Sequence, residues 1–270
     1  MFTDLYNKVS RACCCITVFS GDERISEGTG FSCSPDGLVL TAAHVVTGCW
    51  PLRSKDYEDV NQRIFCKFPG MPVFEYKVLS RHIEIDFPNV FKNRIQLDIS
   101  LLTPKEKYSN PISHLMPCLD PPQLGQQVFI AGYSEELKLP FNLDEILSRD
   151  VRGANEFLEA MSKGYMADMT GPLIKCGHVG NIRRIIGENT TQAEKIECDV
   201  MYIDNSMHYG ASGGPVFNED GEAVGVLSER AITTVNDSND RNISIPSGCT
   251  IAISLTPLNY LLSKLGKRSE

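Results

Sequence analysis

Long hydrophobic runs, basic charge and an export signal are all missing from this sequence. No stretch of its 270 residues approaches the run of about 18 apolar residues that a membrane-spanning helix needs. Residues 1–23 lack the basic start and apolar core of a secretory leader. The formal charge of −8 and the pI near 5.2 differ from the basic balance of a general nucleic-acid binder. We therefore expect a soluble, cytoplasmic protein without a membrane or nucleic-acid partner.

Cysteines are numerous, but the spacing that would mark a metal site is absent. None of the ten forms a C-x-x-C pair, so a structural zinc site is poorly supported. Cys13, Cys14 and Cys15 are adjacent in a short apolar run, 12–19, that favours a buried strand. Without an export signal, we interpret the ten as reduced and mostly buried thiols. We expect no metal and no cofactor.

Short β-like runs separated by turns dominate the rest of the chain. Gly, Pro and Asp stand at their joints, which is typical of an all-β sandwich or barrel. The sequence NEDGEA, 218–223, adds a hairpin signal. Two segments, 142–169 and 256–267, have helical spacing instead. A proline-marked stretch, 111–125, is the candidate linker between two β units. Strands are predicted at 13–19, 37–46, 63–68, 73–79, 98–103, 126–133, 172–180, 195–203, 215–228 and 249–255.

Three residues far apart in the sequence have the chemistry of serine hydrolysis, which needs a nucleophile, a base and an acid that orients the base. Ser212 stands in GASGGPVF, where glycines let the backbone approach another group closely. His44 follows the strand-like GLVLTAA, and Asp98 is a carboxylate inside the apolar LDISLL, where burial requires a partner. Asp86 in HIEIDF is a rival for the acid. A tight turn would explain the glycines around Ser212, but not the distant TAAH and LDISLL.

In this order and at this wide spacing, TAAHVV, DISLL and GASGGPVF resemble the trypsin-like serine peptidases over residues 27–260. The likeness is greatest to their HtrA/Deg-type branch, although no PDZ-like extension fits. The resemblance implies two six-stranded antiparallel β-barrels of the chymotrypsin type with the site between them. The first would span 1–112 with His44 and Asp98. The second would span 113–270 with Ser212, a helical insertion at 142–169 and a terminal helix at 256–267.

The resemblance also implies a role for each site residue. His44 would be the general base, Asp98 its orienting acid and Ser212 the nucleophile. The backbone N–H groups of Gly210 and Ser212 would form the oxyanion hole. Four further residues would bind substrate. Ser228 would lie beside the triad aspartate and Ser206 at the base of the specificity pocket, with Arg230 at the mouth of that pocket and His208 at the border of the cleft. An uncharged Ser206 disfavours cleavage after Lys or Arg.

These observations predict a serine endopeptidase that acts on polypeptide substrates. A catalytically silent or partner-gated peptide-binding module of the same fold is an alternative. An esterase-like hydrolase is another, weakened because GASGG lacks the G-x-S-x-G spacing of a nucleophile elbow. The insertion at 142–169 is either a lid or docking element for a regulatory protein, or a decoration packed on the second barrel. His82, His114 and His178 carry no motif, and we expect structural or surface roles for them.

Overall fold

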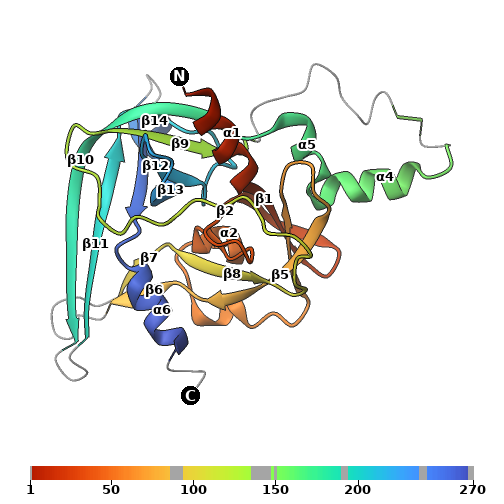
Figure 1. The fold of residues 1–270 in the computed structure, drawn as a ribbon, viewed down its shortest axis with the longest axis horizontal. Helices are drawn as coiled ribbons and strands as arrows, with labels where there is room; N and C mark the ends of the chain where they lie inside the picture. The colour runs from red at the N-terminus through yellow and green to blue at the C-terminus, as the bar shows by residue number, and fades with distance from the viewer. Residues whose placement is uncertain are drawn as a thin grey trace.

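The computed structural model describes residues 2–85, 94–134, 147–148, 151–189, 194–236 and 242–266, and it contains two closed six-stranded antiparallel barrels (Figure 1). The two-barrel fold predicted from the sequence is thereby confirmed. In the first barrel, each strand pairs with the next in the order β1 (Cys13–Ser20), β2 (Glu23–Ser32), β3 (Val39–Thr41), β8 (Ser100–Pro104), β5 (Val73–Ser80) and β4 (Gln62–Lys67). In the second, the order is β10 (Leu173–Asn189), β11 (Glu194–Ile203), β14 (Asn242–Ser254), β13 (Ala223–Asn236), β12 (Pro215–Phe217) and β9 (Gln127–Gly132).

The adjacent cysteines lie in β1, as the apolar run predicts. Cys13, Cys14 and Cys15 are buried, and β1 pairs with β2 on one side and β4 on the other. The strand is thus paired along both edges, and its cysteine side chains lie in the protein interior, where a cysteine behaves as a small hydrophobic residue. All ten cysteines are free thiols. Burial raises the pKa of the Cys13 and Cys14 thiols well above the ordinary value, so both stay protonated.

The predicted hairpin joins β12 to β13. Gly221 has φ +73°, a left-handed conformation that a side chain would strain, and its N–H donates to the Asn218 carbonyl at 3.1 Å. A two-stranded sheet of β6 (Ile83–Ile85) and β7 (Ile95–Leu97) lies outside the barrels. The predicted linker at 111–125 connects β8 of the first barrel with β9 of the second, and an isolated bridge joins Pro117 to Ala223.

An N-terminal helix that the sequence analysis did not predict, α1 (Thr3–Ala12), precedes the first barrel and also packs on the second (Figure 1). The rings of Phe2 and Tyr6 lie 5.0 and 6.0 Å from that of Phe129 in β9. Lys8 Nζ donates to the carbonyl of Gly221 at 3.2 Å. This helix therefore ties the start of one barrel to the surface of the other. At the other end of the chain, α6 (Leu258–Gly266) lies within the predicted terminal helix.

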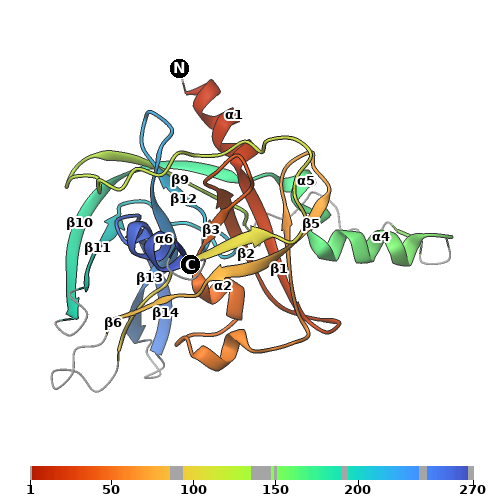
Figure 2. The ribbon, with the colours of Figure 1, turned by 60° about the horizontal axis from the view of Figure 1, so that its bottom comes forward.

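The helical insertion lies between β9 and β10, as predicted. Its described part contains α4 (Ala154–Ala160), a π-helical turn (Met161–Tyr165) and α5 (Ala167–Thr170); residues 142–146 and 149–150 of the predicted segment lie outside the described residues. The segment packs on the first barrel rather than the second, which corrects the decoration alternative. Two polar contacts hold it there, from Thr17 Oγ1 to the Lys163 carbonyl at 3.1 Å and from Lys67 Nζ to Asp168 Oδ1 at 2.6 Å. In both views α4 projects away from the barrels (Figure 2). Docking of a regulatory protein on this segment stays a prediction.

None of the helices in the described part of the chain is long and apolar enough to cross a membrane.

Candidate active site

His44 stands in a single helical turn that follows β3. The strand predicted over 37–46 is wrong from residue 42 on, because α2 (Ala43–Thr47) begins directly after the extended Ala42. Gly48 ends the turn at φ +68°, and its N–H donates to the His44 carbonyl at 2.8 Å. Ala42 and Ala43 before His44 are fully buried, whereas the His44 side chain is 28% exposed.

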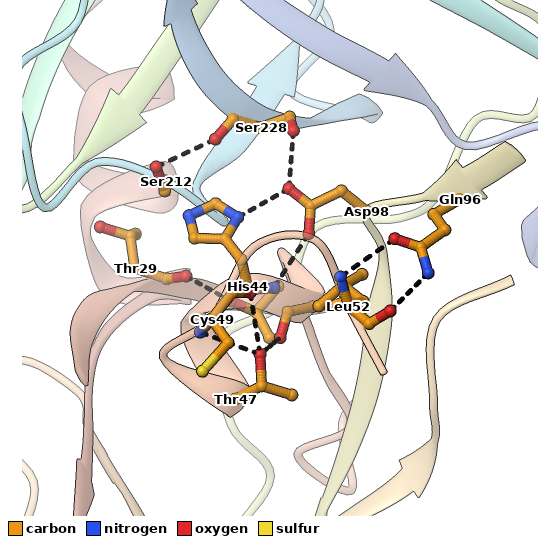
Figure 3. A network of polar contacts seen from close by, with 11 residues as sticks. Thr29, His44, Thr47, Cys49, Leu52, Gln96, Asp98, Ser212 and Ser228 are labelled. Carbon is orange, nitrogen blue, oxygen red and sulfur yellow. Dashed lines mark hydrogen bonds and ion pairs between the residues drawn. The ribbon is translucent and has the colours of Figure 1, made fainter. Parts of the chain in front are cut away.

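Asp98, from the loop between β7 and β8, is almost fully buried, with an exposure of 2%. Its Oδ1 accepts the His44 backbone N–H at 2.9 Å, and its Oδ2 lies 2.7 Å from His44 Nδ1. Ser228 Oγ donates to the same Oδ2 at 2.6 Å (Figure 3). Both carboxylate oxygens therefore have partners, as a buried charge requires. The rival Asp86 lies outside the described residues.

The hydrogen bond between His44 and Asp98 shifts the pKa of each group in opposite directions. Burial disfavours protonated His44, but the hydrogen bond that His44 donates to Asp98 and the charges of Asp98 and Glu229 outweigh it, so the pKa of His44 is raised. Burial alone would raise the pKa of Asp98. The hydrogen bond and charge of His44, with the Ser228 hydroxyl, outweigh that effect and lower this pKa. Asp98 is thus a carboxylate that fixes the imidazole with Nδ1 as the donor and Nε2 facing the cleft.

Ser212 lies on the other side of the His44 ring and comes from the second barrel (Figure 3). Its Oγ donates to the Ser228 carbonyl at 3.0 Å, and among the described residues this is its one hydrogen bond. The glycines that follow it have a steric cause. A Cβ on Gly213 would lie 2.1 Å from the Thr29 carbonyl oxygen, and one on Gly214 would lie 2.0 Å from that of Ala131. The two glycines are thus required by close backbone packing.

Thr29 of the first barrel holds the loop that carries Ser212, a role that the sequence analysis missed. Its Oγ1 donates to the Gly210 carbonyl at 2.7 Å and accepts the Tyr133 N–H at 2.9 Å. Its backbone N–H donates to the Ser212 carbonyl at 2.8 Å. These contacts flank the nucleophile on both sides. The contacts to Gly210 and Ser212 join residues more than 180 positions apart in the sequence, so no local motif around Thr29 reveals them.

The predicted oxyanion donors lie in a turn from His208 to Ala211. The Ala211 N–H donates to the His208 carbonyl at 3.3 Å, and Gly210 has φ +86°. Within the described residues, neither the Gly210 nor the Ser212 amide donates a hydrogen bond. Two N–H groups beside the Ser212 hydroxyl are therefore available to a ligand oxygen.

A cleft of about 300 Å³ opens over His44, Asp98 and Ser212. It includes His208 and Arg230, which the sequence analysis expected there, and Ser228. Ser206 is not among the described residues that line it; the Ser206 hydroxyl donates to the Met207 carbonyl at 3.4 Å. Four lining residues were missed: Trp50, Tyr209, Glu229 and Ile232. Of these, only Glu229 had a sequence signal, its place directly after Ser228.

Two properties of the cleft wall affect what it can hold. The Arg230 guanidinium carbon lies 4.2 Å from the centre of the Tyr209 ring, so the cation stacks on the aromatic face at the rim. The single tryptophan, Trp50, is 60% exposed. A larger hollow, of about 730 Å³, lies between the first barrel and α6. Neither His44, Asp98 nor Ser212 lines it, so the larger volume does not mark the candidate active site.

The remaining histidines lie apart from the triad. His82 stacks on Tyr57 with the ring centres 5.6 Å apart, His114 Nδ1 lies 3.1 Å from the Ile112 carbonyl, and His178 faces Asp204 at 3.5 Å. Among the residues that the structure describes, no three His, Cys, Asp or Glu side chains are placed to hold a metal ion.

A two-barrel β-fold with Ser, His and Asp meeting between the barrels defines the chymotrypsin-like class of proteins. The sequence matches the family described as "Trypsin-like peptidase domain" over residues 28–226, which is most of the chain, and the chain belongs to this family.

Solved structures with the same fold include the Rv3671c protease from M. tuberculosis. Its active form has 20% sequence identity and a TM-score of 0.56, and the match covers 97% of this chain and 84% of that one. The inactive form has 18% identity and a TM-score of 0.53, with coverages of 97% and 92%. Among curated proteins, no match is found.

Proposed function

We propose that this protein is a serine endopeptidase that works through Ser212, His44 and Asp98. The observation that carries the proposal is the hydrogen-bonded row from Ser228 through Asp98 to His44, which ends beside Ser212 (Figure 3). A buried carboxylate that orients an imidazole next to a serine hydroxyl is the arrangement that nucleophilic serine catalysis needs.

In the proposed reaction, the Ser212 hydroxyl leaves the Ser228 carbonyl and turns to His44 Nε2. As Oγ attacks the scissile carbonyl, Nε2 takes its proton, and the Gly210 and Ser212 amides bind the oxyanion. The imidazolium then protonates the leaving nitrogen, which departs with the C-terminal part of the substrate. A water molecule, deprotonated by His44 Nε2, then attacks the ester on Ser212. The imidazolium returns the proton to Ser212 Oγ as the acid product leaves, which regenerates the hydroxyl. Asp98 stays ionised and stabilises the imidazolium.

One observation favours the silent or partner-gated alternative. The Ser212 hydroxyl donates to the Ser228 carbonyl. Within the described part of the chain, it makes no hydrogen bond to His44. A protein that kept this arrangement with substrate bound would bind peptides without cleaving them. In the peptidase, substrate binding must release the hydroxyl.

Labelling with a fluorophosphonate probe tests the proposal, because this probe reacts with activated serines. We expect labelling of the wild type and of Ser263→Ala, which removes an exposed serine on α6, and none of Ser212→Ala or His44→Ala. If the folded wild type is not labelled, while a fluorescent peptide binds equally well to wild type and Ser212→Ala, the silent module is the correct function. If His44→Ala labels as well as the wild type, the triad assignment is wrong.

We also propose a cytoplasmic location, which ten free thiols support. Microscopy of the tagged full chain tests it: a diffuse cytosolic signal is expected, and a signal confined to the secretory route would contradict it. Kinship to the HtrA/Deg-type branch is likewise a proposal, supported by the motif GTGFSCSPDGLVLTAAHVV.

A further inference from the structure

The segment 48–53, which follows the His44 turn, is tied down at Leu52. It connects α2 to a 3₁₀ turn at Ser54–Tyr57, and Trp50 in its middle forms part of the cleft wall. The Leu52 N–H donates to Gln96 Oε1 at 3.0 Å, and Gln96 Nε2 donates to the Leu52 carbonyl. Among the described residues, the Leu52 backbone has no other hydrogen bond. Its two polar groups therefore depend on one side chain.

The Gln96 carboxamide replaces the peptide group that a neighbouring strand would otherwise supply. A carboxamide carries both an acceptor and a donor, so it can satisfy the N–H and the C=O of one residue together. Leu52 is itself buried, with an exposure of 2%, whereas Trp50 two positions earlier is 60% exposed. The exposed cleft wall thus follows the position of the buried Leu52, and Leu52 follows Gln96.

Gln96 belongs to the strand that leads directly into Asp98. It is the middle residue of β7, and Asp98 follows the end of that strand. In the close view, Gln96 lies on the side of Asp98 away from Ser212, with its carboxamide facing Leu52 (Figure 3). A displacement of Gln96 is therefore passed along two residues of main chain to the carboxylate.

The other edge of this strand is firmly packed, so β7 can transmit a position. It pairs with β6, where Ile85 lies opposite Ile95. Ile85 is 4% exposed and Leu97 1%. A Cβ on Gly187 of β10 would lie only 2.2 Å from Ile85 Cγ2, so the second barrel packs closely against the outer strand. The remaining freedom of β7 is on the side of Leu52, where Gln96 holds it.

These contacts close a ring around the acid of the triad. The chain runs from His44 to Leu52, Leu52 is bonded to Gln96, and Gln96 leads to Asp98. Asp98 returns to His44 through Oδ1, which accepts the backbone N–H at 2.9 Å, and through Oδ2, which lies 2.7 Å from Nδ1. In a closed ring, a displacement at one joint is taken up at the others. Loosening the joint at Leu52 therefore changes how the carboxylate meets the imidazole.

We propose that Gln96 is a positioning residue, which holds the cleft wall at Trp50 and the Asp98 carboxylate as one unit and so keeps the imidazole aligned. This inference rests on the proposed function. Gln96 is not among the described residues that line the cleft, so it acts only through Leu52 and Asp98. The same ring gives a ligand that contacts Trp50 a mechanical connection to the acid.

Gln96→Met tests the inference, because methionine keeps the length of the side chain and loses both hydrogen bonds. We expect a weaker contact between His44 Nδ1 and Asp98, and therefore a lower pKa of His44, since that contact raises it in the wild type. Proton NMR of the imidazole measures this pKa without any substrate. His44→Ala identifies the signal among those of the five histidines.

The matched control is Gln127→Met in β9, which removes one glutamine hydrogen bond, to Cys176 Sγ at 2.9 Å, far from this ring. It should leave the pKa of His44 unchanged. The other charged or titratable groups at the cleft belong to the second barrel, and neither substitution alters them; they are His208, Glu229 and Arg230. A change seen only in Gln96→Met is therefore due to the ring.

Two further readouts follow the wall and the reaction. Trp50 is the single tryptophan, so the anisotropy of its fluorescence reports the wall alone and should fall in Gln96→Met. With two substrates of the same acyl part, a nitrophenyl ester and a fluorescence-quenched peptide, we expect kcat to fall about tenfold for both, because small displacements of catalytic groups cost that much or more. Activity should also reach its plateau at lower pH, in step with the pKa of His44.

The inference is overturned if folded Gln96→Met keeps either the wild-type pKa of His44 or the wild-type anisotropy of Trp50. It is also overturned if Gln127→Met changes them equally. If Gln96→Met does not fold, Gln96→Asn decides by the same readouts, because its carboxamide is one methylene too short to reach Leu52. If the wild type turns over neither substrate, the proposed function fails, while the NMR titration and the anisotropy still decide this inference.

Discussion

The two sides of Ser212 differ in how far their polar groups are satisfied. On the side of the cleft, both oxygens of Asp98 accept hydrogen bonds, from His44 and from Ser228. On the side of the helical insertion, the Tyr133 hydroxyl is buried without a partner among the described residues. The first side therefore has its buried polar groups satisfied in the free protein. The second side keeps one buried donor without an acceptor, so we expect variants on the two sides to affect activity and stability differently.

Asp98→Asn should have the largest effect, on the side of the cleft. The amide cannot hold the imidazole in the tautomer that leaves Nε2 free to take a proton, so we expect kcat to fall about 10⁴-fold, as in triads of this geometry. Ester hydrolysis and the rate of fluorophosphonate labelling should fall together. Far-ultraviolet circular dichroism checks that the variant is folded. A folded Asp98→Asn protein with more than a tenth of the wild-type rate would mean that Asp98 is not the orienting acid.

Asp168→Asn is the corresponding test on the side of the helical insertion. It leaves the buried Lys67 cation without its counter-charge, and because Asp168 is itself 38% exposed we expect a moderate loss, about 2 kcal/mol of unfolding free energy. Urea denaturation measures it. The double variant Lys67→Met/Asp168→Asn removes the charge as well and should recover most of the loss. The control Glu159→Gln, in an exposed ion pair with Lys163, should change little. No recovery in the double variant would contradict this account.

The site residues that sequence analysis could predict are those that stand in a short, recognisable sequence motif. TAAH, LDISLL and GASGG each place one candidate residue, His44, Asp98 or Ser212, in a short motif, and the structure brings those three residues together. Thr29, Lys67 and Tyr133 could not be found in this way. Their roles depend on contacts across 181, 101 and 104 positions of sequence, to Gly210, Asp168 and Thr29. The strand predicted to reach residue 46 failed for a related reason, since the one-turn helix at His44 is fixed by its contacts with Asp98.

Helix α1 was missed because a ten-residue helix is stabilised mainly by the surface on which it packs. That surface includes Phe129 and the turn at Gly221, both of the second barrel. Residues 3–12 nevertheless carry a helical signal that the sequence analysis overlooked, because Leu5, Tyr6, Val9 and Ala12 recur at helical spacing. The placement of the insertion on the first barrel was hidden, because it depends on Lys67, a residue that alternation in β4 alone would not mark as buried.

Thr29→Val joins the two sides, because Thr29 contacts both the loop that carries Ser212 and the backbone of Tyr133. Valine has a similar shape but no hydroxyl, so the Gly210 carbonyl and the Tyr133 N–H lose their shared partner. We expect a loss of about tenfold in kcat for the ester and the peptide alike, since small displacements of a catalytic loop cost about that much or more. Thr29→Ser keeps the hydroxyl and should retain most of the activity. Equal rates for Thr29→Val and the wild type would show that the loop keeps its position without this contact.

The smallest expected effect is a shift in pH dependence from Glu229→Gln. The charge of Glu229 contributes to the raised pKa of His44, so its removal should lower that pKa. Because His44 must be neutral to act as a base, activity rises as pH increases through its pKa, and the variant should reach its plateau at lower pH with the plateau rate unchanged. Added salt should shrink the difference, since Glu229 is exposed, and Glu219→Gln on the distant hairpin should show none.

Stability should change with pH in the opposite sense to activity. Protonated His44 stabilises the fold below the pKa of the unfolded chain, and this contribution is lost as pH rises through the raised folded value, in the range where activity appears. Asp98 contributes above its unfolded pKa and loses that contribution as pH falls through its lowered folded value. The thermal-unfolding midpoint, measured against pH in the wild type and in Glu229→Gln, checks this. If the midpoint rises together with activity in both proteins, a group other than His44 controls the acidic side of the pH profile.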